Sequence, residues 1–246
     1  NGFMELPLVG MILGSISAVL LPVFSGMDKG NGMSNETLVV WNSALLKSAK
    51  LIFPMLIFSV FFAEPIMTCM YGDIYAQSSI YFVIKNLSGL FYIIPFYPII
   101  LAIGKTNSYA NAHMIAAFMI VIAEYVVCKT FDSAVYVAIT SELCNLVKIW
   151  LLLRVIANYA HMKITELLPP KPMTILIMIS ALASLPPFLL LDFLNMNKFI
   201  VLFVCLGFFL VDYYVLCWIC KVTYRDIAGG FLKNKSRLNA VVKILP

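Results

Sequence analysis

Residues 51–103 read LIFPMLIFSVFFAEPIMTCMYGDIYAQSSIYFVIKNLSGLFYIIPFYPIILAI, and this stretch decides the fold. Two long apolar runs are joined by a short polar link at residues 71–77. About 20 helical residues cross the roughly 30 Å of hydrocarbon in a bilayer, and each run is long enough to do so. Because the link is short, the two helices must lie antiparallel as neighbours. The stretch therefore predicts a transmembrane hairpin.

Both runs of this hairpin contain residues that a simple membrane span lacks. Its helix-breaking prolines are Pro54, Pro65, Pro95 and Pro98. Its charges are Glu64 and Lys85, each about eight residues from the link and so roughly 12 Å below the same membrane face. A charge in the membrane normally faces a protein interior or a wet cavity. We therefore predict that Glu64 and Lys85 can pair.

The composition of the whole chain agrees with a polytopic membrane protein. It is 62% hydrophobic and only 12% charged, with a mean hydropathy of +0.96, whereas soluble domains carry about 25% charged residues. The net charge of +5 comes from dispersed basic residues without an arginine-rich patch, so no nucleic-acid partner is expected. The six cysteines lack zinc-type spacing, and we predict neither a metal site nor a cofactor.

Five further apolar runs complete a predicted set of seven spans. They are residues 7–26, 108–128, 133–155, 172–191 and 199–220. Residues 27–50 are polar and then mildly amphipathic from Ser34 onward, which predicts a loop with a surface helix that Ser34 or Thr37 can cap. The expected fold is all-α, a polytopic transmembrane bundle of about seven helices.

The basic residues predict the orientation of these spans. When successive connections alternate between the two sides, most of the seventeen basic residues fall on one side, which should be cytoplasmic. They are Lys29, Lys47, Lys50, Lys105, Arg154, Lys163, Lys171, Lys221, Arg225, Lys233, Lys235, Arg237 and Lys243. The opposite side has Lys129 and Lys198, whereas Lys85 and Lys148 lie within spans. The C-terminus is therefore predicted to be cytoplasmic and the 71–77 link external.

The predicted span 133–155 carries the densest polar stripe. Ser141, Asn145 and Lys148 recur at i, i+4 and i+7, so they share one helical face, and Glu142 lies on its edge. Ser141 and Asn145 are of the kind that bonds neighbouring helices. Ionisable groups at this depth more often line a path or bind a ligand, which favours a functional role for Glu142 and Lys148. Asp212 in the last span is either a site residue or the partner of a lysine.

The sequence contains no catalytic motif of a known kind. It lacks a nucleophile elbow, a zinc-protease motif and a phosphate-binding loop. We therefore do not expect an enzyme.

Several stretches, taken in order, resemble the lipid-linked oligosaccharide flippases (Wzx type) of bacterial polysaccharide export, within the multidrug/oligosaccharidyl-lipid/polysaccharide exporter superfamily. They are MELP at 4–7, SISAVLLP at 15–22, KLIFP at 50–54, AEPI at 63–66, YGDIY at 71–75 and AIGK at 102–105. The likeness covers most of residues 1–157. One departure is FDSA at 131–134, where the family usually has glycines.

The resemblance implies a domain arrangement. Residues 1–157 would be helices of the second lobe of a two-lobed exporter, incomplete at the N-terminus, and residues 158–171 a cytoplasmic connector. Residues 172–220 would form two additional transmembrane helices, and residues 221–246 a basic cytoplasmic tail. The missing N-terminal lobe would belong to the same protein, and alternating access would move the substrate between the sides of the membrane.

The resemblance also implies a substrate, an undecaprenyl-diphosphate-linked oligosaccharide repeat unit such as that of O-antigen, flipped across the bacterial inner membrane. A diphosphate with polar sugars needs cations and hydrogen-bond donors to cross hydrocarbon. The candidate substrate-binding residues are Lys85, Lys148, Arg154, Ser141 and Asn145. The candidates for coupling or charge balance are Glu64, Glu142 and Asp212.

The expected partners are the lipid-linked glycan, membrane lipid and the polysaccharide polymerase machinery. Three alternatives stay open. One is a membrane-embedded polymerase or ligase, although the short external links disfavour it. The others are an ion-coupled drug exporter of the same superfamily and a non-transporting structural subunit.

Overall fold

The computed structural model describes residues 6–26, 33–191, 197–222 and 224. These residues form helices and contain no strand. The helices are α1 (Pro7–Ser25), α2 (Asn35–Phe61), α3 (Ala63–Tyr71), the 3₁₀-helix η1 (Asp73–Ser78), α4 (Ser79–Gly89), α5 (Phe96–Ala102), α6 (Thr106–Thr130), α7 (Ala134–Ala160), α8 (Ile164–Leu167), α9 (Pro170–Leu190) and α10 (Lys198–Ile219). The predicted all-α bundle is confirmed.

Six of the described helices are long and apolar enough to cross a membrane: α1, α2, α6, α7, α9 and α10. The second arm of the predicted hairpin differs, because it is broken into α4 and α5 by an irregular segment at residues 90–95. Pro95 explains the break, since it lacks a backbone N–H and restricts the residue before it. The seventh expected span is therefore a discontinuous helix.

The first arm of the hairpin also differs from the prediction, because it begins much earlier than Leu51. The expected surface helix and the expected span are one continuous helix, α2, which Ser34 caps by accepting a hydrogen bond of 3.2 Å from the Thr37 amide. Lys47 and Lys50, which the sequence assigns to the connection at residues 27–50, lie inside this helix. Pro65 sits in the first turn of α3, so the chain bends at Phe62 rather than continuing α2.

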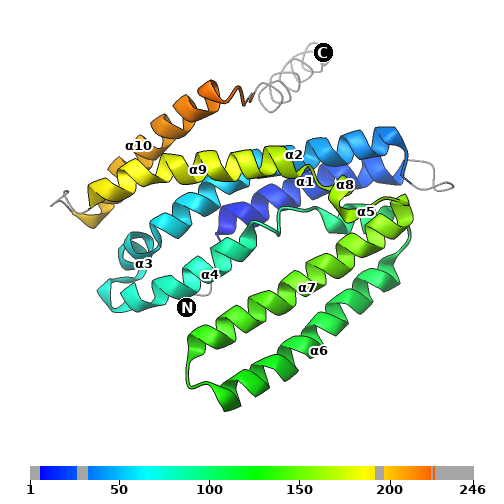
Figure 1. Cartoon of the computed structure of the whole chain (residues 1–246), viewed down its shortest axis with the longest axis horizontal. Helices are drawn as coiled ribbons and strands as arrows, with labels where there is room; N and C mark the ends of the chain where they lie inside the picture. Colours follow the sequence, from blue (N-terminus) through cyan, green and yellow to red (C-terminus); the bar gives the residue numbers. More distant parts are fainter. Residues whose placement is uncertain (1–5, 27–32, 192–196, 223, 225–246) are drawn as a thin grey trace, which may run out of the picture.

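The helix ends gather at two ends of the molecule (Figure 1). The α3–α4 and α6–α7 connections lie at one end, and the α5–α6 connection and α8 lie at the other. An ion pair between Lys198 and Asp73 brings the start of α10 beside η1, at the first end. Consecutive connections between the described helices thus lie at opposite ends of the molecule. The prediction of orientation from the basic residues assumes the same alternation.

Helix α2 is the centre of the packing. It contacts α1, α4 and α9, and α10 covers α9. On α2, Trp41 is fully buried, and its indole N–H donates a 2.8 Å hydrogen bond to the Leu167 carbonyl of α8. The buried hydroxyls of Ser180 and Ser184 bond carbonyls of their own helix, α9, which satisfies them without a partner helix and lets helices approach closely.

Candidate functional site

A buried ion pair joins α4 to α7. Lys85 Nζ lies 3.0 Å from Glu142 Oε1, and the side chains are 12% and 5% exposed respectively. Ser88 Oγ donates a hydrogen bond of 2.5 Å to the other carboxylate oxygen, Oε2. Lys85 and Ser88 are three residues apart on α4 and therefore share a helical face. Both oxygens of Glu142 are thus engaged by one turn of α4.

A second lysine lies next to this pair. Lys148 Nζ donates a 3.1 Å hydrogen bond to Asn145 Oδ1, one turn away on α7. Both lysines lie close to the ring of Tyr92, whose centroid is 5.4 Å from Lys85 Nζ and 5.7 Å from Lys148 Nζ. At these distances a tyrosine face attracts a cation. Tyr92 belongs to the break between α4 and α5, so the break places an aromatic ring close to two cations.

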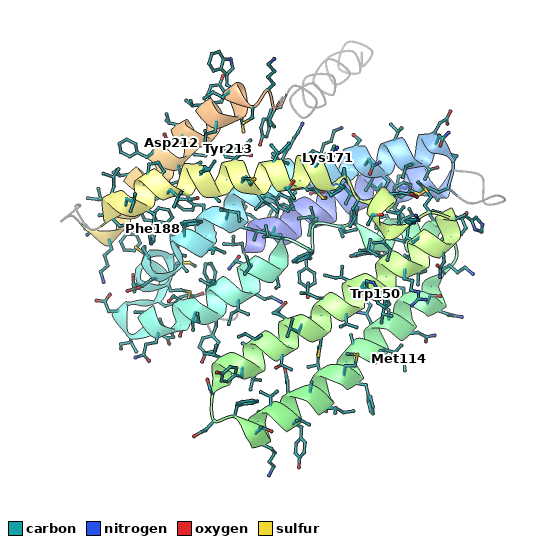
Figure 2. All side chains as sticks on the ribbon, viewed as in Figure 1. Met114, Trp150, Lys171, Phe188, Asp212 and Tyr213 are labelled. Atoms are coloured by element: carbon teal, nitrogen blue, oxygen red, sulfur yellow. The ribbon has the colours of Figure 1, made fainter. Side chains whose placement is uncertain are left out.

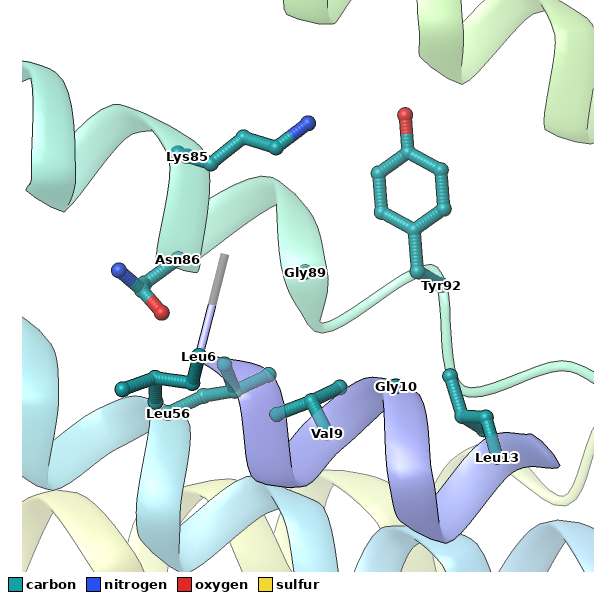
Figure 3. A pocket seen from close by; sticks show the side chains of 9 residues that line it. All are labelled: Leu6, Val9, Gly10, Leu13, Leu56, Lys85, Asn86, Gly89 and Tyr92. Carbon is teal, nitrogen blue, oxygen red and sulfur yellow. The ribbon is translucent and has the colours of Figure 1, made fainter. Parts of the chain in front are cut away.

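A cavity of about 130 Å³ lies on the other side of α4, toward α1 and α2 (Figure 3). It is lined by Leu6, Val9, Gly10, Leu13, Leu56, Lys85, Asn86, Gly89 and Tyr92. Lys85 and Tyr92 extend away from α1, so the cavity is bordered by their apolar parts while their polar ends point elsewhere. The buried Asn86 donates its amide to the Phe82 carbonyl at 2.7 Å. The walls are therefore mainly apolar.

Four of the predicted site residues come together in this cluster. They are Lys85, Glu142, Asn145 and Lys148. Ser141 is half-buried on the same helix, α7. Among the residues that the structure describes, none forms a group of three or more histidine, cysteine or acidic side chains that could hold a metal ion.

The predicted pairing of Glu64 with Lys85 is wrong. Glu64 is an exposed residue of α3, whereas Lys85 forms its salt bridge with Glu142. The prediction matched the two charges by depth alone. It did not account for the direction of each side chain around its helix axis, nor for the bend at Phe62 that redirects α3.

Two further candidates lie away from the cluster. Arg154 is exposed and sits 5.3 Å from the ring of Trp150, nearer the end of α7. Asp212 belongs to α10, and Figure 2 shows it on the opposite side of the central helices from Trp150 of α7. Glu142 and Asp212 are two of the acids that the sequence offers for coupling or charge balance, and neither is shown paired with Lys148. Glu142 pairs with Lys85 instead, and Asp212 is remote from α7.

Sequence reasoning missed Ser88 and Tyr92. Ser88 follows Lys85 by three residues, which already places both on one helical face. Tyr92 lies three residues before Pro95, and a proline in an apolar run signals that a nearby side chain can leave the helical register. The contact of Tyr92 with Lys148 has no local signal, because it joins residues on two separate elements.

The described residues have the fold of a multi-pass helical membrane protein in which one predicted span is divided into α4 and α5. A solved structure of the same fold is the lipid II flippase MurJ in its inward closed conformation, with a TM-score of 0.65 and 18% sequence identity. The match covers 89% of this chain and 45% of the flippase, so the chain spans less than half the length of that protein. No protein-family model and no curated protein sequence matches the chain.

Proposed function

We propose that this chain is part of a transporter that flips a lipid-linked diphosphate saccharide across a bacterial inner membrane by alternating access. One observation carries the proposal: two lysines from different elements, Lys85 and Lys148, both lie within 6 Å of the Tyr92 ring inside the bundle. The fold shared with a lipid II flippase supports the lipid-linked class of substrate. The resemblance of residues 1–157 to polysaccharide exporters supports an oligosaccharide repeat unit on undecaprenyl diphosphate as the particular substrate.

The chemistry of such a substrate fits this cluster. A diphosphate cannot cross hydrocarbon without cationic or hydrogen-bonding partners, and lysine binds phosphate as a point charge. Lys148 lies about 9 Å inside Arg154 along α7, by the helical rise, so the cation sits well within the predicted span. Tyr92 and Asn145 add groups that can hydrogen-bond sugars. The polyprenyl tail can remain in lipid.

The remaining structural parts of the proposal concern the assembly. The neighbour is more than twice as long as the matched region, and we propose that a facing lobe of the same protein completes the cavity. The α9–α10 pair would correspond to the two helices outside the lobes, since it packs on the side of α2 away from α7. The cytoplasmic position of the C-terminus follows from the distribution of basic residues.

The test is substitution of Lys148 in the intact protein. Lys148→Ala should reduce flipping of a fluorescent undecaprenyl-diphosphate oligosaccharide in proteoliposomes to background, because the phosphate loses a cation. Lys148→Arg should keep partial activity, since the charge survives while its geometry changes. Lys129→Ala is the matched control, because Lys129 is an exposed lysine at the end of α6. Normal flipping by a well-folded Lys148→Ala protein would contradict the proposal.

A further inference from the structure

Each oxygen of the Glu142 carboxylate is held by a donor from α4. One oxygen accepts from the Lys85 ammonium at 3.0 Å, and the other accepts from the Ser88 hydroxyl at 2.5 Å. A lysine ammonium is a donor that proteins also use for phosphate. The donors come from α4 and the anion from α7, so the contact joins two elements that are separate in the sequence.

A diphosphate that reaches Lys85 must compete with this carboxylate. Breaking a buried pair without replacement is strongly unfavourable, because it leaves a charge uncompensated. Exchange of one anion for another keeps Lys85 paired in both states. Glu142 remains beside the incoming diphosphate, however, and the two negative groups repel each other.

The exchange also has a consequence for α4. The ion pair and the Ser88 hydrogen bond tie the second half of α4 to α7, and α4 is separated from α5 by the break at residues 90–95. When the carboxylate loses Lys85, one of these ties is gone, and α4 can shift at the break. A ligand that binds the released state better moves the equilibrium toward it.

We infer that Glu142 is an internal anion that occupies the phosphate-binding lysine in the resting protein and lowers the affinity for the substrate diphosphate. This inference rests on the proposed function. Glu142 reclaims Lys85 after transport and thereby promotes release of the product. It is a positioning residue, since it acts on the substrate through Lys85.

The experiment measures binding of farnesyl diphosphate to the intact protein in nanodiscs, with farnesol as the uncharged comparison. Glu142→Gln keeps the size of the side chain and a carbonyl oxygen for Ser88, but it removes the charge. We expect it to tighten farnesyl diphosphate binding by about tenfold, mainly through slower dissociation, because the competing state disappears. Farnesol binding should not change.

Two other variants keep the test decisive. Ser88→Ala removes the hydroxyl that holds Glu142 Oε2 and that also bonds the Lys85 carbonyl of its own helix at 2.9 Å. The charge of Glu142 stays, so this variant should tighten binding by a smaller factor, even if Glu142→Gln fails to fold. Glu124→Gln is the matched control, since Glu124 is a partly buried carboxylate of α6 outside the cluster, and it should leave the affinity unchanged.

The outcomes separate the two proposals. If the wild-type protein binds farnesyl diphosphate and the folded Glu142→Gln or Ser88→Ala variant binds it equally or more weakly, the internal-anion role is overturned and the proposed function stands. If neither the wild-type protein nor any variant binds the diphosphate more tightly than farnesol, the proposed function fails, and the role of Glu142 fails with it.

Discussion

At the scale of single residues, the buried charges show what helical depth can and cannot predict. Lys85 was correctly placed within the hairpin as a charge in need of a partner, but its partner is 57 residues away on α7 rather than on the neighbouring arm. Depth follows from the rise per residue, whereas pairing depends on how each helix is rotated and where it bends. Glu64 matches Lys85 in depth along the sequence, but the bend before α3 leaves its side chain exposed and away from Lys85.

The Lys85–Glu142 pair should appear as a strong coupling in a double-mutant cycle. Lys85→Met and Glu142→Gln should each lower the free energy of unfolding by about 3–5 kcal/mol, because each leaves a buried charge without its partner. The double variant should lose much less than the sum of the two. Thermal or denaturant unfolding in detergent measures all four proteins.

The same measurement tests the pairing that was predicted from depth. Glu64 is exposed on α3, so the effects of Glu64→Gln and Lys85→Met should add within about 0.5 kcal/mol. A coupling of the Lys85–Glu64 cycle as large as that of the Lys85–Glu142 cycle would contradict the arrangement of α3, α4 and α7 described above.

At the scale of elements, the link of the hairpin depends on one glycine. Gly72 ends α3 with φ +93° and ψ 168°, a backbone conformation that residues with a Cβ rarely adopt. An added Cβ would meet no atom within 4 Å, so the constraint is conformational and not steric crowding by neighbours. The sharp reversal from α3 into η1 therefore needs glycine.

Substitution of this glycine has a predictable cost. Gly72→Ala should lower the free energy of unfolding by roughly 1–3 kcal/mol, because alanine must adopt the same strained backbone. Gly207→Ala in α10 is the control: it adds the same methyl group in open space within a helix, where alanine is favoured over glycine. Equal melting temperatures for Gly72→Ala and the wild-type protein would show that the link tolerates another conformation.

The elements also explain the two errors of the predicted spans. The continuity of α2 was missed because Asn42, Ser43 and Lys47 make its first half polar, which favoured a separate surface helix, although helix packing buries neighbouring positions such as Trp41 and Leu45. Pro95 signalled the interruption of the second arm. It did not signal that the interruption brings the Tyr92 ring close to Lys85 and Lys148. A hydropathy pattern averages over a window, whereas one proline acts at one peptide bond.

At the scale of the whole molecule, the orientation remains a prediction that labelling can test. The structure places η1 and the start of α10 at one end, and α8 at the other. In a background without the six native cysteines, a membrane-impermeant thiol reagent should label Asp73→Cys in intact cells. It should label Lys163→Cys only after permeabilisation, since the side richer in lysine and arginine faces the cytoplasm.

The positions used for that test are exposed and lie within the described residues. Asn195 and Ser236, which the sequence also predicts to lie outside and in the cytoplasm respectively, fall outside the described residues. Labelling of Lys163→Cys but not Asp73→Cys in intact cells would show that the orientation is the reverse of the predicted one. Labelling of both positions from outside would contradict the alternation of the spans.

The sequence by itself determined that the protein is a helical membrane bundle, approximately where its helices lie, and that lysines and acids sit inside it. These properties follow from local hydropathy, helix-breaking residues and the cost of charge in a membrane. Only the tertiary structure decided that Glu142 is the partner of Lys85, that Tyr92 lies close to both Lys85 and Lys148, and that Asp212 lies on the opposite side of the central helices from Trp150 of α7. The reason is physical: contacts between helices depend on their rotation, bends and packing, which arise from the whole chain and leave no signal at a single position.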